Sequence, residues 1–288
     1  MFNVFTQSSI FGILALGVTL AIISKGIDLS LGSVLALSDV IAASFAQTPE
    51  AVGKYFSEIP LLTPVIPIVI ALVIAAICGA VNGSLIAYTG IPAFIATLGM
   101  FTVARGLALI YTGGRPISSL SAGFTVFGDR LFGFFPMPVV VYAVMVVMTW
   151  ILLGNTRFGK SVFAIGGNIK AAEVSGIPVK RNLVLIYAYC GLMAGVAAVV
   201  FAGRVQSVHP GAAVGYELTA IAASTIGGTS HSGGIGTVWG AVIGALILGV
   251  LRNGLTLLGV HPYWQQVAEG VIIVVAVIID MRTNAQKR

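Results

Sequence analysis

Long uncharged apolar stretches occupy most of this chain, and they limit its possible folds more than any other feature. Of its 288 residues, 58% are hydrophobic and 8% are charged, and the mean hydropathy is +1.04. An ordinary soluble domain carries roughly 25% charged residues. The composition therefore excludes a water-soluble monomer, a disordered chain and a disulfide-stapled scaffold. It predicts a polytopic membrane protein.

The apolar stretches predict an all-α fold with about nine transmembrane or partly inserted helices. A span needs about 20 residues, so a single transmembrane domain accounts for residues 1–288. The second and seventh segments are short and rich in Gly, Ser and Ala, and we expect each to bend or to enter only part of the bilayer. The segments are 2–23, 28–46, 64–88, 91–112, 137–154, 183–203, 216–228, 235–252 and 262–281.

Basic residues set the predicted orientation, because cytoplasmic loops of membrane proteins are enriched in Lys and Arg. With 155–182 and the C-terminal tail inside, the inner set is Lys25, Arg157, Lys160, Lys170, Lys180, Arg181, Arg282, Lys287 and Arg288. The smaller outer set is Lys54, Arg115, Arg130, Arg204 and Arg252. This predicts a cytoplasmic C-terminus, external loops at 47–63 and 113–136, and an external N-terminus with no preceding helix. The net charge of +6 is explained by orientation and does not indicate nucleic-acid binding.

Two short strings repeat in the two halves of the chain. Gly26-Ile-Asp-Leu-Ser30 opens the second segment, and Gly215-Tyr-Glu-Leu-Thr219 opens the seventh. A weaker pair begins at Gly79 and Gly240. Because the second and seventh segments cross in opposite directions, the pattern predicts an inverted repeat of the kind found in transporters, with the pathway at the repeat interface. Chance similarity in a Gly/Ala-rich chain is the alternative.

Residues Gly154 to Ser161 match the phosphate-loop pattern G-x-x-x-x-G-K-S. Such a loop binds phosphate only between a buried strand and a helix. Here it follows an apolar span, and nothing in the chain supplies the rest of a nucleotide-binding fold. We therefore predict a short basic loop at the cytoplasmic face that binds no nucleotide.

Polar residues inside the apolar segments are candidates for a translocation pathway. Asp28 and Asp39 are close to three helical turns apart, so we expect them to share a helix face, with Asp39 about 16 Å along it near mid-bilayer. A carboxylate there suits a polyhydroxylated solute, or it pairs structurally with another helix, and both interpretations stay open. On polarity alone, the predicted pathway residues are Asp28, Asp39, Asn82, Glu217 and Asn253.

The remaining polar positions predict structural roles. Arg105 and Glu269 lie nearer helix ends, where we expect them to snorkel to the interface. His231 belongs to a Gly-rich turn and is expected to be exposed. No Cys/His cluster has metal-ligand spacing, so we expect no metal site. The row Gly236, Gly240 and Gly244 predicts close helix packing. Cys78 and Cys190 lie inside apolar segments, so we expect both to be thiols of the protein core.

The loop 155–182 contains a small amphipathic piece from Asn168 to Ile177. Gly166 and Gly167 break the chain before it, Gly176 ends it, and adjacent alanines favour a short helix. Isolated helices of under about twelve residues are marginal, so we expect a partner groove to order this segment. A plain linker is the alternative, although 28 residues exceed the usual connection length.

Four ordered blocks resemble ribose-type permeases of ATP-binding-cassette (ABC) importers. They are Gly26–Ser33, Gly166–Ile177, Gly215–Ser230 and Asn253–Gly259. The resemblance implies a permease with ten spans, usually paired, in a bacterial inner membrane. Two ATPase subunits that carry ATP and Mg²⁺ would dock on it, and an extracytoplasmic binding protein would deliver a pentose, hexose or related solute. The residues implied to couple to the ATPase are Asn168, Ala171, Ala172, Glu173, Gly176 and Ile177.

Under this resemblance the chain itself binds no cofactor and catalyses nothing. Family members usually carry one more N-terminal helix, which would explain the external N-terminus predicted here. A mis-assigned start codon is our first expectation, and a nine-helix variant is the second. Two alternatives stay open for function: a stand-alone ion-coupled symporter or channel using Asp39, and an ABC permease for a non-sugar solute such as branched-chain amino acids. An intramembrane enzyme lacks support, because no nucleophile–base pair or metal set is present.

Overall fold

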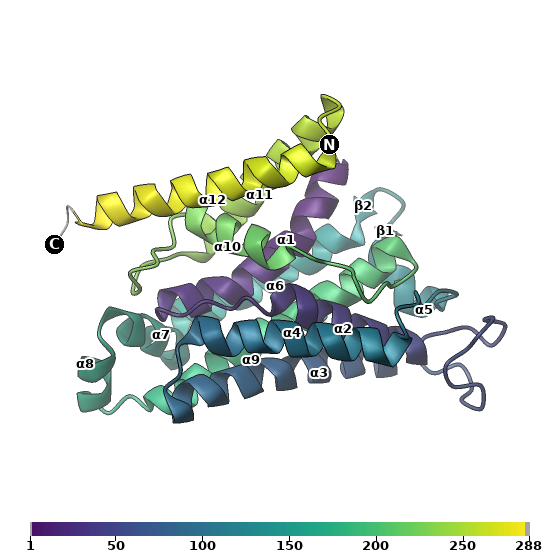
Figure 1. Ribbon diagram of the computed structural model, residues 1–288, viewed down its shortest axis with the longest axis horizontal. Coiled ribbons are helices and arrows are strands. Elements are labelled where there is room, and N and C mark those ends of the chain that lie inside the picture. The colour runs from purple at the N-terminus through teal and green to yellow at the C-terminus, as the bar shows by residue number, and fades with distance from the viewer. Residues whose placement is uncertain (1, 286–288) are drawn as a thin grey trace.

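A computed structural model describes residues 2–285, and this part of the chain is almost entirely helical (Figure 1). The basic residues Lys287 and Arg288 lie outside the described residues. The helices are α1 (Phe2–Ile23), α2 (Leu31–Phe45), α3 (Val65–Ser84), α4 (Ala93–Thr112), α5 (Ala122–Thr125), α6 (Met137–Asn155), α7 (Arg157–Gly167), α8 (Ile169–Val174), α9 (Val179–Val205), α10 (Tyr216–Ile226), α11 (Val238–Leu257) and α12 (Pro262–Ala285). Two short helical turns, η1 (Leu85–Thr89) and η2 (Val126–Gly128), and the hairpin β1 (Arg130–Leu131) and β2 (Phe135–Pro136) complete it.

Each of the nine apolar segments contains one helix, so the all-α prediction is confirmed. Within residues 2–285, six helices are long and apolar enough to cross a membrane: α1, α3 with η1, α4, α6, α9 and α11. The second and seventh segments are short, as predicted, since α2 has 15 residues and α10 has 11. The ninth segment forms α12, whose apolar part runs over Pro262–Ile278.

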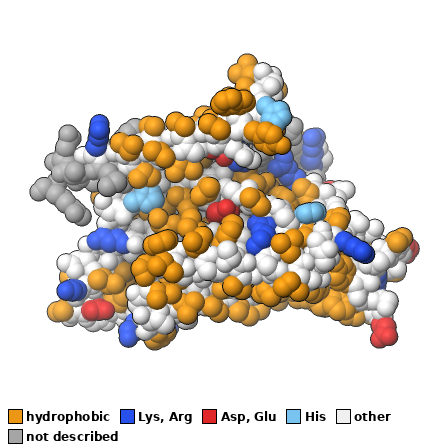
Figure 2. All heavy atoms as spheres, in the orientation of Figure 1, with side chains coloured by type: hydrophobic (Ala, Val, Ile, Leu, Met, Phe, Trp, Pro, Cys, Tyr) orange, Lys and Arg blue, Asp and Glu red, His pale blue; other side chains and the backbone are white. Residues whose placement is uncertain are grey.

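Helix α1 lies at the centre of the bundle and is almost completely buried. It packs against α6, α9, α10 and α11. Small residues permit this: Gly17 approaches the backbone of Cys190, and a side chain at Gly12 would overlap the ring of Tyr142. By contrast, α3, α4, α6 and α11 expose large apolar side chains. Hydrophobic side chains are spread widely over the face seen in Figure 2. These outer helices suit a hydrocarbon environment, whereas α1 is shielded from it.

Glycines set the closest helix contacts. A side chain at Gly79 of α3 would overlap the carbonyl of Tyr187 in α9. In α11, side chains at Gly240 and Gly244 would overlap carbonyls of Gly227 and Ala223, next to or within α10. The small-residue row therefore has the packing role that the sequence predicted, because backbones approach closely only where no Cβ intervenes.

The two short helices have corresponding neighbours. Helix α2 packs against α3, α4 and α9, while α10 packs against α11, α12 and α1. The two sets of neighbours correspond if the helices of the two halves are matched in order: α1 with α9, α2 with α10, α3 with α11 and α4 with α12. The packing of α3 on α9 likewise corresponds to that of α11 on α1.

The connecting segments gather at two opposite ends of the bundle (Figure 1). At the α8 end, the amide of Gly234 donates to the carbonyl of Ile23 over 2.8 Å, next to α7. At the hairpin end, residues 46–64, 113–136 and 206–215 meet: Ser121 N donates to Ala46 O, and Ile117 pairs with Val208. Helix α12 runs towards the α8 end.

Candidate functional site

The helices α2 and α10 begin side by side in the interior of the bundle. Each follows an irregular segment, residues 24–30 before α2 and 206–215 before α10. Gly32 in the first turn of α2 lies so close to the Glu217 carboxylate of α10 that a Cβ there would overlap Oε2 and lie 2.5 Å from the carbonyl oxygen of Ala213. The start of α2, just after the first repeated string, therefore meets the second repeated string in space. Interrupted helices whose N-termini lie inside the membrane are a recurrent feature of transporter sites.

Asp28 anchors a polar cluster beside the start of α2. Its Oδ1 accepts hydrogen bonds from the Ser30 amide, over 2.9 Å, and from the Ser30 hydroxyl, over 2.6 Å. Asn82 of α3 donates to the same hydroxyl over 3.0 Å. Asp28 Oδ2, Asn82 Oδ1 and the hydroxyl of nearby Tyr187 are buried and have no hydrogen-bond partner among the described residues. The fold thus brings together the predicted pathway residues Asp28 and Asn82, and each keeps an oxygen that can still accept a hydrogen bond.

Glu217 and Arg105 form a second polar group nearby. Glu217 Oε1 accepts from the Gly215 amide over 3.1 Å. Arg105 of α4 donates from one terminal nitrogen to the carbonyls of Pro210 and Ala212, over 2.7 and 2.8 Å. This arginine therefore ties the irregular segment before α10 to α4.

Two of the predicted pathway residues lie apart from these groups. Asp39 is fully buried in the middle of α2, and neither carboxylate oxygen has a partner in the described part of the chain. Asn253 is half-buried on α11. The expectation that Asp28 and Asp39 share a helix face is wrong. Asp28 precedes α2 in an irregular segment, because its side chain binds the backbone and hydroxyl of Ser30 in a local turn.

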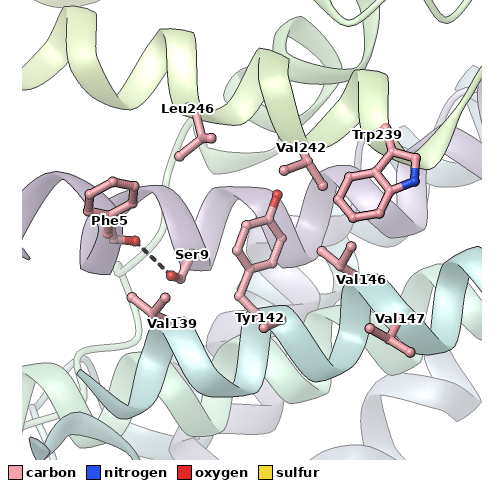
Figure 3. A pocket seen from close by; sticks show the side chains of 10 residues that line it. Phe5, Ser9, Val139, Tyr142, Val146, Val147, Trp239, Val242 and Leu246 are labelled. Atoms are coloured by element: carbon pink, nitrogen blue, oxygen red, sulfur yellow. Dashed lines mark hydrogen bonds between the residues drawn. The ribbon is translucent and has the colours of Figure 1, made fainter. Parts of the chain in front are cut away.

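A separate pocket opens between α1, α6 and α11 (Figure 3). Its volume is about 280 Å³, and its lining is apolar apart from Ser9 and Tyr142. The Ser9 hydroxyl is already bound to the carbonyl of Phe5 over 2.7 Å. An apolar lining of this kind suits a hydrocarbon chain rather than a hydroxylated solute.

The phosphate-loop lookalike has no strand before it. Residues Gly154–Ser161 connect α6 to α7, and Thr156 caps α7 by accepting from the amide of Gly159 over 3.1 Å. A side chain at Gly159 would overlap the carbonyl of Leu153. The second glycine of the pattern therefore serves a tight helix–helix corner.

The segment after α7 forms the expected short helix, α8. Asn168 is its N-cap and accepts from the amide of Ala171 over 3.1 Å, while Gly176 ends it with a left-handed φ of 79°. Its predicted coupling residues divide between two faces. Asn168, Ala171, Glu173 and Gly176 are exposed, whereas Ala172 is buried and Ile177 half-buried against Ile165 and Val179. The expectation that a partner must order this helix is corrected, because Ala172 docks it on α7 and α9.

One junction at the α8 end joins three segments. Gly166 of α7 lies against the carbonyl of Ile23, at the end of α1, and against the amide of Gly234, after α10. Lys25 donates from Nζ to the carbonyl of Gly167 over 3.4 Å. Lys25 has a φ of 64°, an uncommon backbone conformation for a residue other than glycine. We call these residues the Gly166 junction; it connects the α7–α8 segment to the segments that flank both short helices.

Comparison with known proteins settles the family. The family described as "Branched-chain amino acid transport system / permease component" matches residues 1–277. The chain belongs to this permease family. No solved structure matches it.

Permeases with assigned sugar substrates are similar to this chain along its length. The ribose import permease protein RbsC of Bacillus subtilis is 45% identical over 285 residues, covering 98% of this chain and 85% of the relative. The galactose/methyl galactoside import permease protein MglC of Salmonella typhimurium is 41% identical over 293 residues, covering 99% and 87%. RbsC of Escherichia coli is 41% identical over 288 residues, covering 97% and 85%. The resemblance to ribose-type ABC permeases is confirmed.

Three structural expectations are wrong for this permease. Arg105 does not snorkel, because the carbonyls of the segment before α10 hold it. Glu269 pairs with Arg252 instead of reaching the interface, and Arg252 also binds Thr219 over 3.1 Å. His231 is half-buried and lies 2.9 Å from the Thr225 hydroxyl. Each of these side chains has a partner within the protein, and pairing stabilises charged and polar groups that are withdrawn from water.

Sequence reasoning missed Arg105 and Ser30 as members of the polar centre. The signal for Arg105 was present, because an arginine within an apolar segment is by default a functional candidate. Ser30 carried no such signal. Its role depends on Asn82, which is 52 residues away and reaches it only in the folded chain.

Proposed function

We propose that this chain is the transmembrane subunit of an ABC importer and translocates a monosaccharide delivered by an extracytoplasmic binding protein. The observation that carries the proposal is its full-length similarity to ribose and galactose import permeases, at 41–45% identity. As a transport subunit it performs no catalysis. ATP and Mg²⁺ would be bound by separate ATPase subunits, and this chain needs no cofactor of its own.

We place the α8 end in the cytoplasm. Two observations support this orientation. The basic loop 155–182 lies there, and the segments after α1 and α10, which the predicted topology places inside, meet it at the Gly166 junction. Segments assigned outside meet at the opposite, hairpin end. Placing basic loops inside follows the known bias of membrane proteins.

We further propose that the domain contains an inverted repeat, with α1–α4 related to α9–α12. The support is the corresponding neighbours of α2 and α10, together with the two repeated strings Gly26–Ser30 and Gly215–Thr219 at the starts of these segments. Such a repeat would place the two short helices at the repeat interface, where transporters bind their solutes.

The polar centre formed by Asp28, Ser30, Asn82, Arg105 and Glu217 is the proposed pathway. It lies where α2 and α10 begin. We propose that a second permease chain, identical or homologous, completes the pathway in the assembled transporter.

The exposed face of α8 is the proposed ATPase contact. Asn168, Ala171 and Glu173 point outward from a helix that is anchored from behind. Ala172 and Ile177 would act indirectly, by holding α8 in place.

Reconstitution with its cognate ATPase and binding protein tests this function. Proteoliposomes should take up at least one of D-ribose, D-galactose, D-glucose, D-xylose and L-arabinose only when ATP is enclosed. A matched panel of leucine, isoleucine and valine tests the amino acid alternative suggested by the family description. Uptake driven by a proton or sodium gradient without ATPase would instead support the stand-alone symporter, for which the unpartnered Asp39 is the candidate ion site.

A further inference from the structure

We propose that Arg105 and Glu217 form a solute subsite in which one hydroxyl of the sugar bridges the guanidinium and the carboxylate. This deepens the function proposed above and rests on it. The inference starts from hydrogen-bonding capacity that the protein itself does not use.

Both side chains have buried polar atoms without partners. Arg105 uses one terminal nitrogen for the carbonyls of Pro210 and Ala212, while its Nε and second terminal nitrogen are buried and unbonded among the described residues. Glu217 is 5% exposed, and its Oε2 is likewise buried and unbonded there. Buried polar groups are nearly always hydrogen-bonded, so unsatisfied donors and an unsatisfied acceptor in one place need an explanation.

The two groups interact electrostatically but do not join directly. Their charges are close enough to attract each other, yet they make no ion pair or hydrogen bond in the described part of the chain. Arg252 and Glu269, in contrast, form a direct pair in the same molecule. Each charged group is held from behind, Arg105 by the two carbonyls and Glu217 by the Gly215 amide.

A sugar hydroxyl matches this arrangement chemically. It accepts a hydrogen bond from a guanidinium and donates its own proton to a carboxylate, so a single hydroxyl satisfies both sides. Hydrogen bonds to charged groups are also stronger than those between neutral groups. Gly32 has no side chain, and its backbone packs directly against Oε2, while Ala213 next to it has a strained φ of 56°.

The subsite is tested in the reconstituted transporter with Glu217→Gln and Arg105→Lys. Glu217→Gln keeps an oxygen for the Gly215 amide, and Arg105→Lys keeps the positive charge. Both should lower the maximal uptake rate at least about tenfold, as expected when a charged hydrogen bond is lost. Glu58→Gln and Arg115→Lys, on exposed loops, are the matched controls and should transport normally. Comparisons use variants that co-purify with the ATPase at the wild-type level, and Glu217→Asp replaces Glu217→Gln if the latter does not assemble.

A series of monodeoxy sugars separates solute contact from a structural role. Removing the bridging hydroxyl from the sugar should slow uptake by the wild type about tenfold. The same removal should slow uptake by Glu217→Gln less than twofold, because this variant already lacks the carboxylate that the hydroxyl binds. Variants that transport within twofold of wild type would overturn the subsite and leave the importer function standing. The subsite would also be overturned if, for every deoxy sugar, the effect of the missing hydroxyl and the effect of the substitution on uptake were fully additive. Full additivity would show that the two side chains have a structural role. Absence of ATP-dependent uptake of any sugar by the wild type would overturn the proposed function and the subsite together.

Discussion

Replacing Gly166 by alanine should uncouple ATP hydrolysis from transport. A Cβ at this position would lie 2.6 Å from the amide nitrogen of Gly234 and 2.8 Å from the carbonyl carbon of Ile23, and closer still to the Ile23 oxygen. Carbon atoms pack at about 3.5–4.0 Å, so the three backbones must separate by roughly 1 Å. Since this junction connects the α7–α8 segment to both short helices, the separation should weaken transmission of ATPase movement to the pathway.

The energetic cost can be worked from the same contacts. Overpacking a close contact costs about 1–3 kcal/mol. Loss of the hydrogen bond from Gly234 to Ile23 adds about 1 kcal/mol. We therefore expect local destabilisation of about 2–4 kcal/mol at the junction, large enough to disturb its geometry in the assembled transporter.

Gly167→Ala is the matched control. Gly167 is the next residue, is also helical and exposed, and an added Cβ would meet nothing within 4 Å. Alanine there should be neutral or stabilising by up to about 1 kcal/mol through helix propensity. In reconstituted complexes with the ATPase and the loaded binding protein, sugar uptake per ATP hydrolysed should fall at least fivefold for Gly166→Ala and stay unchanged for Gly167→Ala. Equal ratios for the two variants would refute the role of the junction.

Three further predictions follow from the α8 end. With an impermeant thiol reagent on intact cells, a cysteine replacing Lys54 should react and one replacing Lys170 should not; the reverse pattern would invert the orientation. Lys160→Ala should leave transport within about twofold, and the purified chain should bind no ATP, because the loop lies between two helices; measurable ATP binding that this change abolishes would contradict us. Glu173→Arg should reduce ATPase docking without destabilising the fold, since the side chain is exposed. Gly176→Val should reduce docking and also destabilise the fold, because the left-handed φ at this position costs a branched residue about 1–2 kcal/mol. ATPase co-purification and thermal unfolding of the permease separate these two effects, and normal coupling in both variants would disprove the docking role of α8.

The sequence by itself determined the membrane class and the positions of the nine helical segments. Uninterrupted apolar runs can satisfy their backbone hydrogen bonds in a bilayer only as helices or closed barrels, and their length selected helices. Local signals also sufficed for α8, since the cap at Asn168 and the left-handed glycine at position 176 act within one or two turns.

Only the tertiary structure decided which polar residues share a site. Asp28 meets Asn82 through Ser30, and Arg105 meets the segment before α10, across long separations that no local pattern encodes. The prediction that Asp28 and Asp39 share a helix face failed because a local turn at Ser30 delays the start of α2 until Leu31. Whether a charged residue in an apolar segment reaches water or a buried partner depends on which helices pack beside it, and here glycine contacts between distant helices set that packing.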